Sequence, residues 1–316
     1  MALSTSPLLP ASERPPSLVA IRRAAGYNGE LLELLYETLR EFRLPVVGKS
    51  VLLKPNLVQS DSQCVINTHP AVIAAAREAF LKLGAGRVTI GEGPGHERDT
   101  AAILEEIRLR DWVGGLRGLF VDLNVEEVRE VALRTRASKL RRLFLPAAVL
   151  EADFVVSMPK MKTHHWVGAT LSLKNLFGIV PGSCYGWPKN VLHWAGIENS
   201  ILDLATTVRP DFAIVDGIVA MEGNGPIQGT AKAAGVLVMG DDPVAVDATA
   251  ARVMGLAPER IGYLKKAGYV LGNLREEKIR QIGEKPEKVR QRFAVLDRFQ
   301  GLVDFPAASK NAPEQS

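Results

Sequence analysis

Short apolar runs rich in β-branched residues alternate along the chain with longer segments of helical pattern, and polar or glycine-rich turns follow many of the short runs. Such alternation predicts an α/β fold with mixed, largely parallel sheets and flanking helices. The predicted strands are Leu18–Ile21, Val51–Leu53, Val88–Ile90, Leu119–Val121, Phe154–Ser157, Phe212–Val215 and Val236–Met239. The predicted helices are Leu31–Phe42, Ala71–Leu83, Thr100–Arg110, Val191–Thr207, Val244–Met254 and Glu259–Lys266.

The chain is long enough for two lobes around a cleft, and we expect an N-terminal α/β lobe over residues 18–145 and a C-terminal one over residues 146–305. Both ends, residues 1–17 and 306–316, are polar and poor in core residues, so we expect disordered tails there. No run of about 18 apolar residues occurs, and no signal-peptide pattern opens the chain. We therefore expect a cytoplasmic protein with no membrane partner.

Composition narrows the class of protein. Of the 316 residues, 47% are hydrophobic and 23% are charged, which excludes disorder of the whole chain. The net charge of +4 is a mild excess and predicts no nucleic-acid partner. The two cysteines, Cys64 and Cys184, lie far apart in the sequence, so we expect no iron–sulfur cluster within this chain.

Chemistry-bearing residues follow several predicted strands directly. In open α/β sheets, ligands bind beyond the carboxyl ends of the strands. Four such turns are Lys54-Pro55-Asn56, the glycine-rich Gly91–His96, the basic Pro159–His165, and Asp216-Gly217. We expect them to meet in one hollow.

The segment from Pro159 to Gly182 is the strongest local signal. It places Lys160, Lys162, His164, His165 and Lys174 in what we expect to be a glycine-bounded loop and a following helix. Crowded ammonium groups favour an anionic ligand, and crowding lowers a lysine's pKa toward that of a base or nucleophile. The alternative is a solvated basic loop with Lys174 on an exposed helix face.

Histidines lie in or beside these turns. His96 and His164 are candidates for proton transfer, whereas His69 before Pro70 is typical of a helix start. Gly93 and Gly95 would let backbone N–H groups face a ligand. Their turn has neither the GxGxxG nor the GxxxxGK(S/T) spacing of nucleotide-binding loops. For His193, the sequence leaves two alternatives: a residue of the site or an ordinary helix residue.

Four carboxylates follow strands or lie at or near the start of a helix. Glu92 is a candidate general base or metal ligand, with an ion pair to Arg98 or a nearby lysine as the alternative, and Asp216 is a plausible site carboxylate. Asp242 before Pro243 is typical of a helix N-cap. For Asp247, just over one turn further along, a position facing the cleft is left as an alternative. The candidate metal ligands are His193, Glu92 and Asp216.

Four ordered motifs between Val51 and Leu256 carry a family resemblance. They are LKPNLV, PKMKTHHWVGATLSLKNLFGIVPG, RPDFAIVDGIVAMEGNGP and GDDPVAVDATAARVMG. On these motifs the chain resembles domain-of-unknown-function family 362 of bacteria and archaea, whose name assigns no activity. Some relatives carry a ferredoxin-like iron–sulfur module, but this chain lacks the cysteines for one.

A second resemblance is to the lactate racemase family, whose lysine tethers a nickel-pincer nucleotide. The order of His164, Gly168, Lys174 and Pro181-Gly182 is similar to an order of the same residue types there. The resemblance implies a cofactor-anchoring position for Lys174 and proton-transfer positions for His96 and His164. It also places His193 near a metal-binding histidine and implies a nucleotide-like or metal-containing cofactor.

We therefore expect an enzyme that binds an anionic small molecule or cofactor in a Lys/His-lined cleft, with racemase- or epimerase-like proton or hydride transfer as the favoured reaction. The alternatives are a redox enzyme with an external iron–sulfur electron carrier and a non-catalytic protein that binds an anionic metabolite. The aromatic segment Tyr185–Trp194 would exclude water. The expected catalytic residues are His96, His164 and Lys174, and the expected binding residues are Lys54, Asn56, Gly93, Gly95, Lys160, Lys162 and Asn175.

Overall fold

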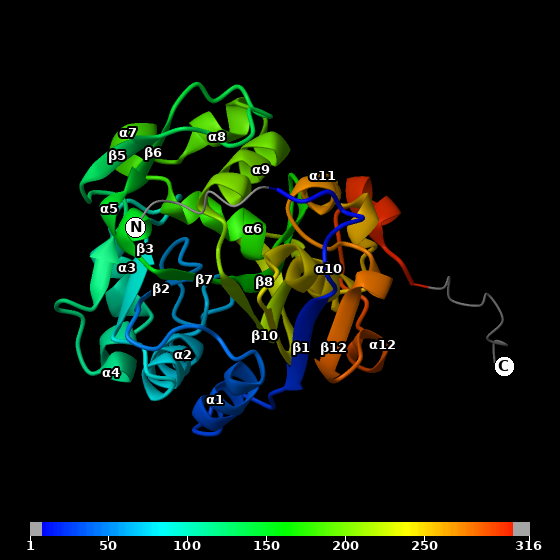
Figure 1. Ribbon diagram of the computed structural model, residues 1–316, viewed down its shortest axis with the longest axis horizontal. Helices are drawn as coiled ribbons and strands as arrows, with labels where there is room; N and C mark the ends of the chain where they lie inside the picture. The colour runs from blue at the N-terminus through cyan, green and yellow to red at the C-terminus, as the bar shows by residue number, and fades with distance from the viewer. Residues whose placement is uncertain (1–7, 306–316) are drawn as a thin grey trace, which may run out of the picture.

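A computed structural model describes residues 8–305 and contains a 10-stranded sheet, a two-stranded sheet and flanking helices (Figure 1). The strands of the large sheet are β1 (Ser17–Arg23), β2 (Ser50–Pro55), β3 (Arg87–Glu92), β4 (Phe120–Asp122), β7 (Phe154–Met158), β8 (Lys160–His164), β9 (Gly168–Thr170), β10 (Phe212–Asn224), β11 (Gln228–Gly240) and β12 (Ile279–Gly283). The small sheet pairs β5 (Val128–Val131) with β6 (Leu143–Pro146). The α-helices are α1 (Leu31–Glu41), α2 (Pro70–Lys82), α3 (Thr100–Glu106), α4 (Leu109–Val113), α5 (Ala147–Glu151), α6 (Ser172–Asn175), α7 (Gly182–Tyr185), α8 (Asn190–Trp194), α9 (Ile197–Val208), α10 (Pro243–Val253), α11 (Gly262–Val270) and α12 (Pro286–Val289).

The large sheet is mostly parallel, as the sequence predicts. Its order is β12-β1-β11-β10-β7-β2-β3-β4, with β8 paired to β10 and to β9. Only β11 and β9 run antiparallel to their neighbours. The mixed α/β fold class is confirmed, but two lobes are not, because β2 and β7 lie on opposite sides of the predicted boundary at residues 145–146 and pair directly.

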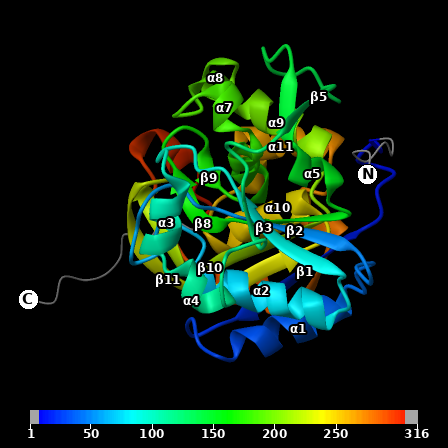
Figure 2. The same cartoon turned by 90° about the vertical axis from the view of Figure 1, so that its left-hand side faces the viewer.

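Alternating side chains of the central strands are buried on both faces of the sheet. Val19 and Ile21 of β1 belong to the core shared with α9, α10 and α11, whereas Ala20 belongs to the core shared with α1 and α2. The helices accordingly cover the two faces of the sheet, with α1 and α2 below it and α9, α10 and α11 above it in Figure 2. This double burial explains the nearly continuous apolar runs of the predicted strands.

Several predicted elements differ in the structure. β10 and β11 each extend over 13 residues, of which only Phe212–Val215 and Val236–Met239 are predicted. The expected loop after β7 is strand β8, which runs parallel to β10. The predicted helix Val191–Thr207 is divided into α8 and α9 at Gly196, whose φ is +98°. The predicted helix Thr100–Arg110 is divided into α3 and α4 at Arg108, whose φ is +54°. Left-handed backbone angles end a helix and leave no trace in the apolar pattern.

The ends of the chain are only partly described. Residues 1–7 and 306–316 of the predicted tails lie outside the described residues. Nearer the fold, the Arg14 guanidinium donates to the backbone carbonyls of Gly268, Tyr269 and Gly272, so residues before β1 are attached to α11 and the turn after it. Within residues 8–305, no helix has the length and apolar character needed to cross a membrane.

Candidate functional site

A cavity of about 270 Å³, called here the central cavity, lies beyond the carboxyl ends of β2 and β3 and beside β8. The strands are parallel, so the residues that follow them meet at one edge of the sheet. The charged and polar lining residues are Asn56, Glu92, His96, Lys162, His164, His165, Thr170, Lys174, Asn175, Lys189, Asn190 and His193. Gly95, Trp166 and Phe177 contribute to its walls.

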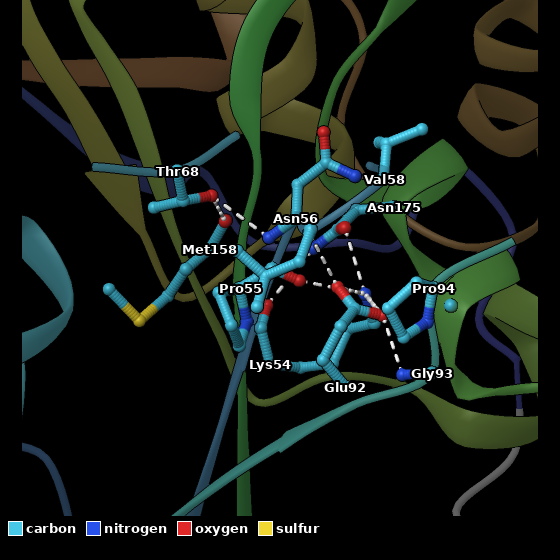
Figure 3. Close-up of polar contacts among 12 residues, drawn as sticks. Lys54, Pro55, Asn56, Val58, Thr68, Glu92, Gly93, Pro94, Met158 and Asn175 are labelled. Atoms are coloured by element: carbon cyan, nitrogen blue, oxygen red, sulfur yellow. Dashed lines mark hydrogen bonds and ion pairs between the residues drawn. The ribbon is translucent and has the colours of Figure 1, made fainter. Parts of the chain in front are cut away.

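Lys54 lies beneath the central cavity in a fully buried ion pair with Glu92 (Figure 3). Its Nζ donates to Glu92 Oε2 at 2.8 Å, to the Pro55 carbonyl at 2.7 Å and to Asn175 Oδ1 at 3.0 Å. Glu92 also accepts from the backbone N–H of Leu57 and of Gly93, each at 2.8 Å. Glu92 therefore forms the ion pair with a nearby lysine that is the alternative prediction. The polar contacts of Lys54 Nζ are all made within the protein.

Gly178 makes room for this pair. A Cβ atom at this position would lie 2.0 Å from Glu92 Oε1 and 2.4 Å from Lys54 Nζ, so only glycine allows the backbone to pass the ion pair. Asn175 joins the pair to the next strand, because its Nδ2 donates to the Lys54 carbonyl and to Ser157 Oγ. The floor of the central cavity is therefore a closed hydrogen-bond network.

Lys174 differs from Lys54 in having no partner. Within residues 8–305, no hydrogen-bond acceptor or carboxylate contacts its Nζ, which lies 3.8 Å from the centre of the Phe177 ring. Burial and the nearby Lys54 charge lower the pKa of Lys174 to about 7. A substantial fraction of its amine is therefore neutral at neutral pH, as a base requires.

The short helix α6 carries Lys174 and is capped from another element. Asp247 of α10 accepts from the backbone N–H of Ser172 at 2.7 Å, from that of Leu173 at 3.0 Å and from the Ser172 hydroxyl. Burial raises the pKa of Asp247 to about 7, although these hydrogen bonds oppose the rise. Asp247 therefore positions the helix and does not point into a cleft, whereas Asp242 is the N-cap of α10 as predicted.

Two further lysines reach the central cavity. The Lys162 Nζ donates to the Ile66 carbonyl at 2.8 Å, and burial with neighbouring lysines lowers its pKa well below the usual range. The Lys189 Nζ donates to the Gly93 carbonyl at 2.6 Å, and burial lowers its pKa to about 7. Lys189 is not among the predicted site residues, because no motif around it distinguishes it from a surface lysine.

Two imidazoles of the central cavity, those of His164 and His193, are neutral at neutral pH. Burial and nearby lysines lower the pKa of His164 well below its usual value and lower that of His193 to about 4. The His164 Nδ1 accepts from the Trp166 backbone N–H at 3.0 Å, which leaves the proton on Nε2. His96 also lines the cavity and is exposed at its edge.

Three buried polar atoms of the lining have no hydrogen-bond partner in the described part of the chain. They are Asn56 Oδ1, Thr170 Oγ1 and His193 Nδ1. Buried polar atoms are nearly always paired in folded proteins. Their gathering around an unpaired lysine distinguishes this cavity from a packing defect, because a packing defect is lined by apolar atoms.

Lys160 and Asp216 do not line the central cavity. They form a separate, fully buried ion pair at 2.7 Å, and Asp216 also accepts from the Tyr27 hydroxyl and the His69 backbone N–H. Lys160, a predicted binding residue, and Asp216, a predicted metal ligand, are therefore paired with each other and lie outside the central cavity. His69 caps α2 through its Nδ1, as expected for a helix start.

Other candidates have mixed placements. Gly93 is held by Glu92 and Lys189 and does not line the cavity, whereas Gly95 does. Within residues 8–305, no group of three His, Cys, Asp or Glu side chains is arranged to hold a metal ion. The rings of Tyr185 and Trp194 lie outside the cavity, and Trp166 forms the aromatic wall in their place.

The region that contains the four motifs matches a known protein family. The family described as Domain of unknown function (DUF362) matches residues 51–252. A thylakoid-associated protein of Synechocystis sp. (strain ATCC 27184 / PCC 6803 / Kazusa) is 32% identical over 227 residues, which are 68% of this chain and 65% of that protein. The chain thus spans 65% of the length of this curated relative.

Two solved structures align with part of this chain. The lactate racemase apoprotein of Thermoanaerobacterium thermosaccharolyticum has a TM-score of 0.45 and 17% identity, over 70% of this chain and 55% of that chain. A structural-genomics target from Thermotoga maritima has a TM-score of 0.37 and 14% identity, over 68% and 55%. Since the family match extends over more than half of the sequence, the chain belongs to the DUF362 family, as its four motifs predict.

Proposed function

We propose that this protein is an enzyme that binds a small anionic molecule in the central cavity and transfers a proton on it. One observation carries the proposal: an unpaired lysine and three unpaired buried polar atoms line the same cavity. An unpaired buried polar group costs about 1–3 kcal/mol. A ligand that pairs with these groups would recover that free energy.

The lining defines the chemistry of the ligand. The ammonium form of Lys174 would bind a carboxylate or phosphate, and Lys162 and Lys189 add positive charge when they are protonated. Asn56 Oδ1 accepts only, so the ligand would need a hydroxyl or amine beside its anionic group. The Phe177 and Trp166 rings would cover its apolar part.

The same groups support proton transfer. A neutral Lys174 amine or a neutral imidazole can take a proton from the carbon beside a carboxylate, and the electrons of that C–H bond then pass into the carboxylate. Ammonium groups around the cavity would stabilise the developing negative charge. Return of a proton from a second group that is protonated, on the opposite face, would invert the carbon, which is a racemase- or epimerase-like reaction.

The first test is a thermal-shift screen of carboxylates and phosphates at pH 6.5 and pH 8.5. A ligand at about 100 times its Kd adds about 2.7 kcal/mol of stability. We expect binding to weaken as pH rises through about 7, because the Lys174 ammonium deprotonates there and only the ammonium attracts an anion.

Incubation of the bound ligand in D₂O then separates an enzyme from a binding protein. Proton transfer predicts deuterium at the carbon beside the acid group, measured by mass spectrometry, and Lys174→Met should abolish both binding and exchange. Lys265→Met, at an exposed position, is the matched control. Binding without exchange would identify a non-catalytic carrier, and full activity of Lys174→Met would overturn the proposed site.

A further inference from the structure

A second hollow, of about 550 Å³, lies on the outer side of α8 and is called here the outer hollow. Leu140, Phe144, Val191 and Trp194 give it an apolar floor. Trp194 is 75% exposed and Val191 is 38% exposed. In both views of the fold, α7, α8 and β5 lie together at the top of the molecule (Figures 1 and 2). Tryptophan, whose ring is apolar and whose N–H is polar, is enriched at interfaces and in membrane-interface belts.

The rim of the outer hollow is basic. Lys139, Arg141 and Arg142 are exposed and line it. Residues 134–142, with the sequence RTRASKLRR, contain five basic residues and no acidic one. Within residues 8–305, no carboxylate pairs with Lys139 or Arg141, and Arg142 reaches only the exposed Glu130, at 3.7 Å.

This basic segment is held in place. The buried Asp203 of α9 accepts from the Thr135 hydroxyl, from the Ala137 backbone N–H and from the backbone and hydroxyl of Ser138. The Lys139 backbone N–H donates to the Ala195 carbonyl beside α8. The cationic rim and the exposed indole therefore keep a fixed relation to each other before any partner binds.

We infer that the outer hollow docks on an anionic lipid bilayer surface, with Trp194 at the level of the headgroups and Lys139, Arg141 and Arg142 over their phosphates. Basic side chains near such a surface each contribute about five-fold to the partition coefficient, and tryptophan favours the membrane interface. This revises the expectation of no membrane partner, which considered only spanning segments.

A bilayer fits this surface better than the other anionic partners. A polynucleotide would pair with the basic rim but leave the apolar floor of Leu140, Phe144 and Val191 without a partner. A specific protein partner needs about 800 Å² of complementary surface, which is more than a few side chains around one short helix supply. The interface of a bilayer accepts charge and apolar groups together and needs no fitted shape.

The docking surface and the central cavity share α8. Asn190 and His193 line the central cavity, while Val191 and Trp194 line the outer hollow. Docking would therefore place the wall of the cavity within one helix diameter of the lipid headgroups. The inference itself does not depend on the proposed reaction, because it rests on the surface residues alone.

Sedimentation with vesicles tests the inference. The full chain should sediment with vesicles of phosphatidylcholine and phosphatidylglycerol at a 7:3 ratio and not with phosphatidylcholine alone. Lys139→Glu/Arg141→Glu should lower the partition coefficient at least about 25-fold, from two charges at about five-fold each. Lys265→Glu/Lys285→Glu makes the same change of net charge at exposed positions elsewhere and should bind like the wild type.

Tryptophan fluorescence identifies the docking residue. Anionic vesicles should shift the emission to shorter wavelength in the wild type and in Trp112→Phe but not in Trp194→Phe. Equal thermal midpoints of all variants show that they are folded. Sedimentation of the charge-reversed protein at the wild-type level would overturn the inference. So would absence of vesicle binding, or binding of an oligonucleotide or polyglutamate in preference to the vesicles.

Discussion

At the scale of single residues, the central cavity holds amines whose charge the fold does not compensate. A lysine in an unfolded chain has a pKa of about 10.4, whereas that of Lys174 is about 7. Between these values the unfolded chain binds more protons than the folded one, so the free energy of unfolding rises with pH. Lys174 thus lowers stability near neutral pH, as expected of a residue kept for function.

Lys174→Met should therefore raise the free energy of unfolding at pH 7 by about 1 kcal/mol or more. The gain should shrink toward pH 10, where the wild-type amine is neutral in both states. Urea unfolding at pH 7, 8.5 and 10 measures it, with Lys265→Met at an exposed position as the control. A gain that stayed constant over this range would contradict the assignment of an uncompensated amine.

In the Lys54–Glu92 pair, in contrast to Lys174, two opposite charges are buried together and compensate each other. Removing one partner of a buried pair costs about 3–5 kcal/mol, since the other charge stays behind. We expect Glu92→Gln to destabilise the protein by this amount and Lys54→Met/Glu92→Gln to lose less than the sum of the single changes. A double-mutant cycle in urea measures the coupling, and additive losses would rule it out.

The sequence could not assign partners to its lysines. The pattern predicts one anion site for four lysines that follow a strand or lie between Pro159 and Gly182, namely Lys54, Lys160, Lys162 and Lys174. The partner of Lys160 is Asp216, 56 positions away, and that of Lys54 is Glu92, 38 positions away. Pairing at such distances depends on strand order, which a local pattern does not contain.

At the scale of elements, the site depends on a cap between two helices. The four-residue α6 is not stable on its own, because a helix this short leaves most of its backbone groups without hydrogen-bond partners. Asp247→Ala should cost about 1–2 kcal/mol, by analogy with a lost N-cap. It should also weaken ligand binding, since Lys174 and Asn175 lie on α6.

The conservative variant separates positioning from general damage. Asp247→Asn keeps one carbonyl acceptor for the α6 backbone and should restore most of the ligand affinity that Asp247→Ala loses. Thermal-shift titrations of the three proteins with one ligand make the comparison. Equal affinity in Asp247→Ala and wild type would show that α6 holds its position without this cap.

The bounds of a helix or strand could be predicted where a single apolar pattern extends over the whole element. α1, α2 and α10 and the strands β1, β2, β3 and β7 lie within a few residues of their predicted bounds, whereas β10 and β11 extend well beyond theirs. β8 was missed because its sequence, KMKTH, is polar, yet all five residues are buried beside β10. The lysines within it compensate their burial with partners from other elements, such as Asp216 and the Ile66 carbonyl, and hydrophobic periodicity cannot show this.

At the scale of the whole molecule, the two ends of the described chain are joined in one sheet. β1 lies between β11 and β12, so the first strand of the chain completes the C-terminal half of the sheet. β7 lies between β2 and β10, which joins the two halves a second time. A cut at residues 145–146 would leave each half with an unpaired central strand, and buried backbone groups without partners are costly.

This topology predicts one cooperative unfolding transition, against the two that separate lobes would give. Calorimetric and van't Hoff enthalpies should agree, and the far-ultraviolet circular dichroism and tryptophan fluorescence curves should coincide. Trp112 reports on the α4 region and Trp166, Trp187 and Trp194 on the site region, so a variant that keeps only Trp112 samples the N-terminal half alone. Coincidence of its curve with that of the wild type would show that the halves unfold together, whereas an earlier or later midpoint would restore the two-lobe division that the continuous sheet argues against.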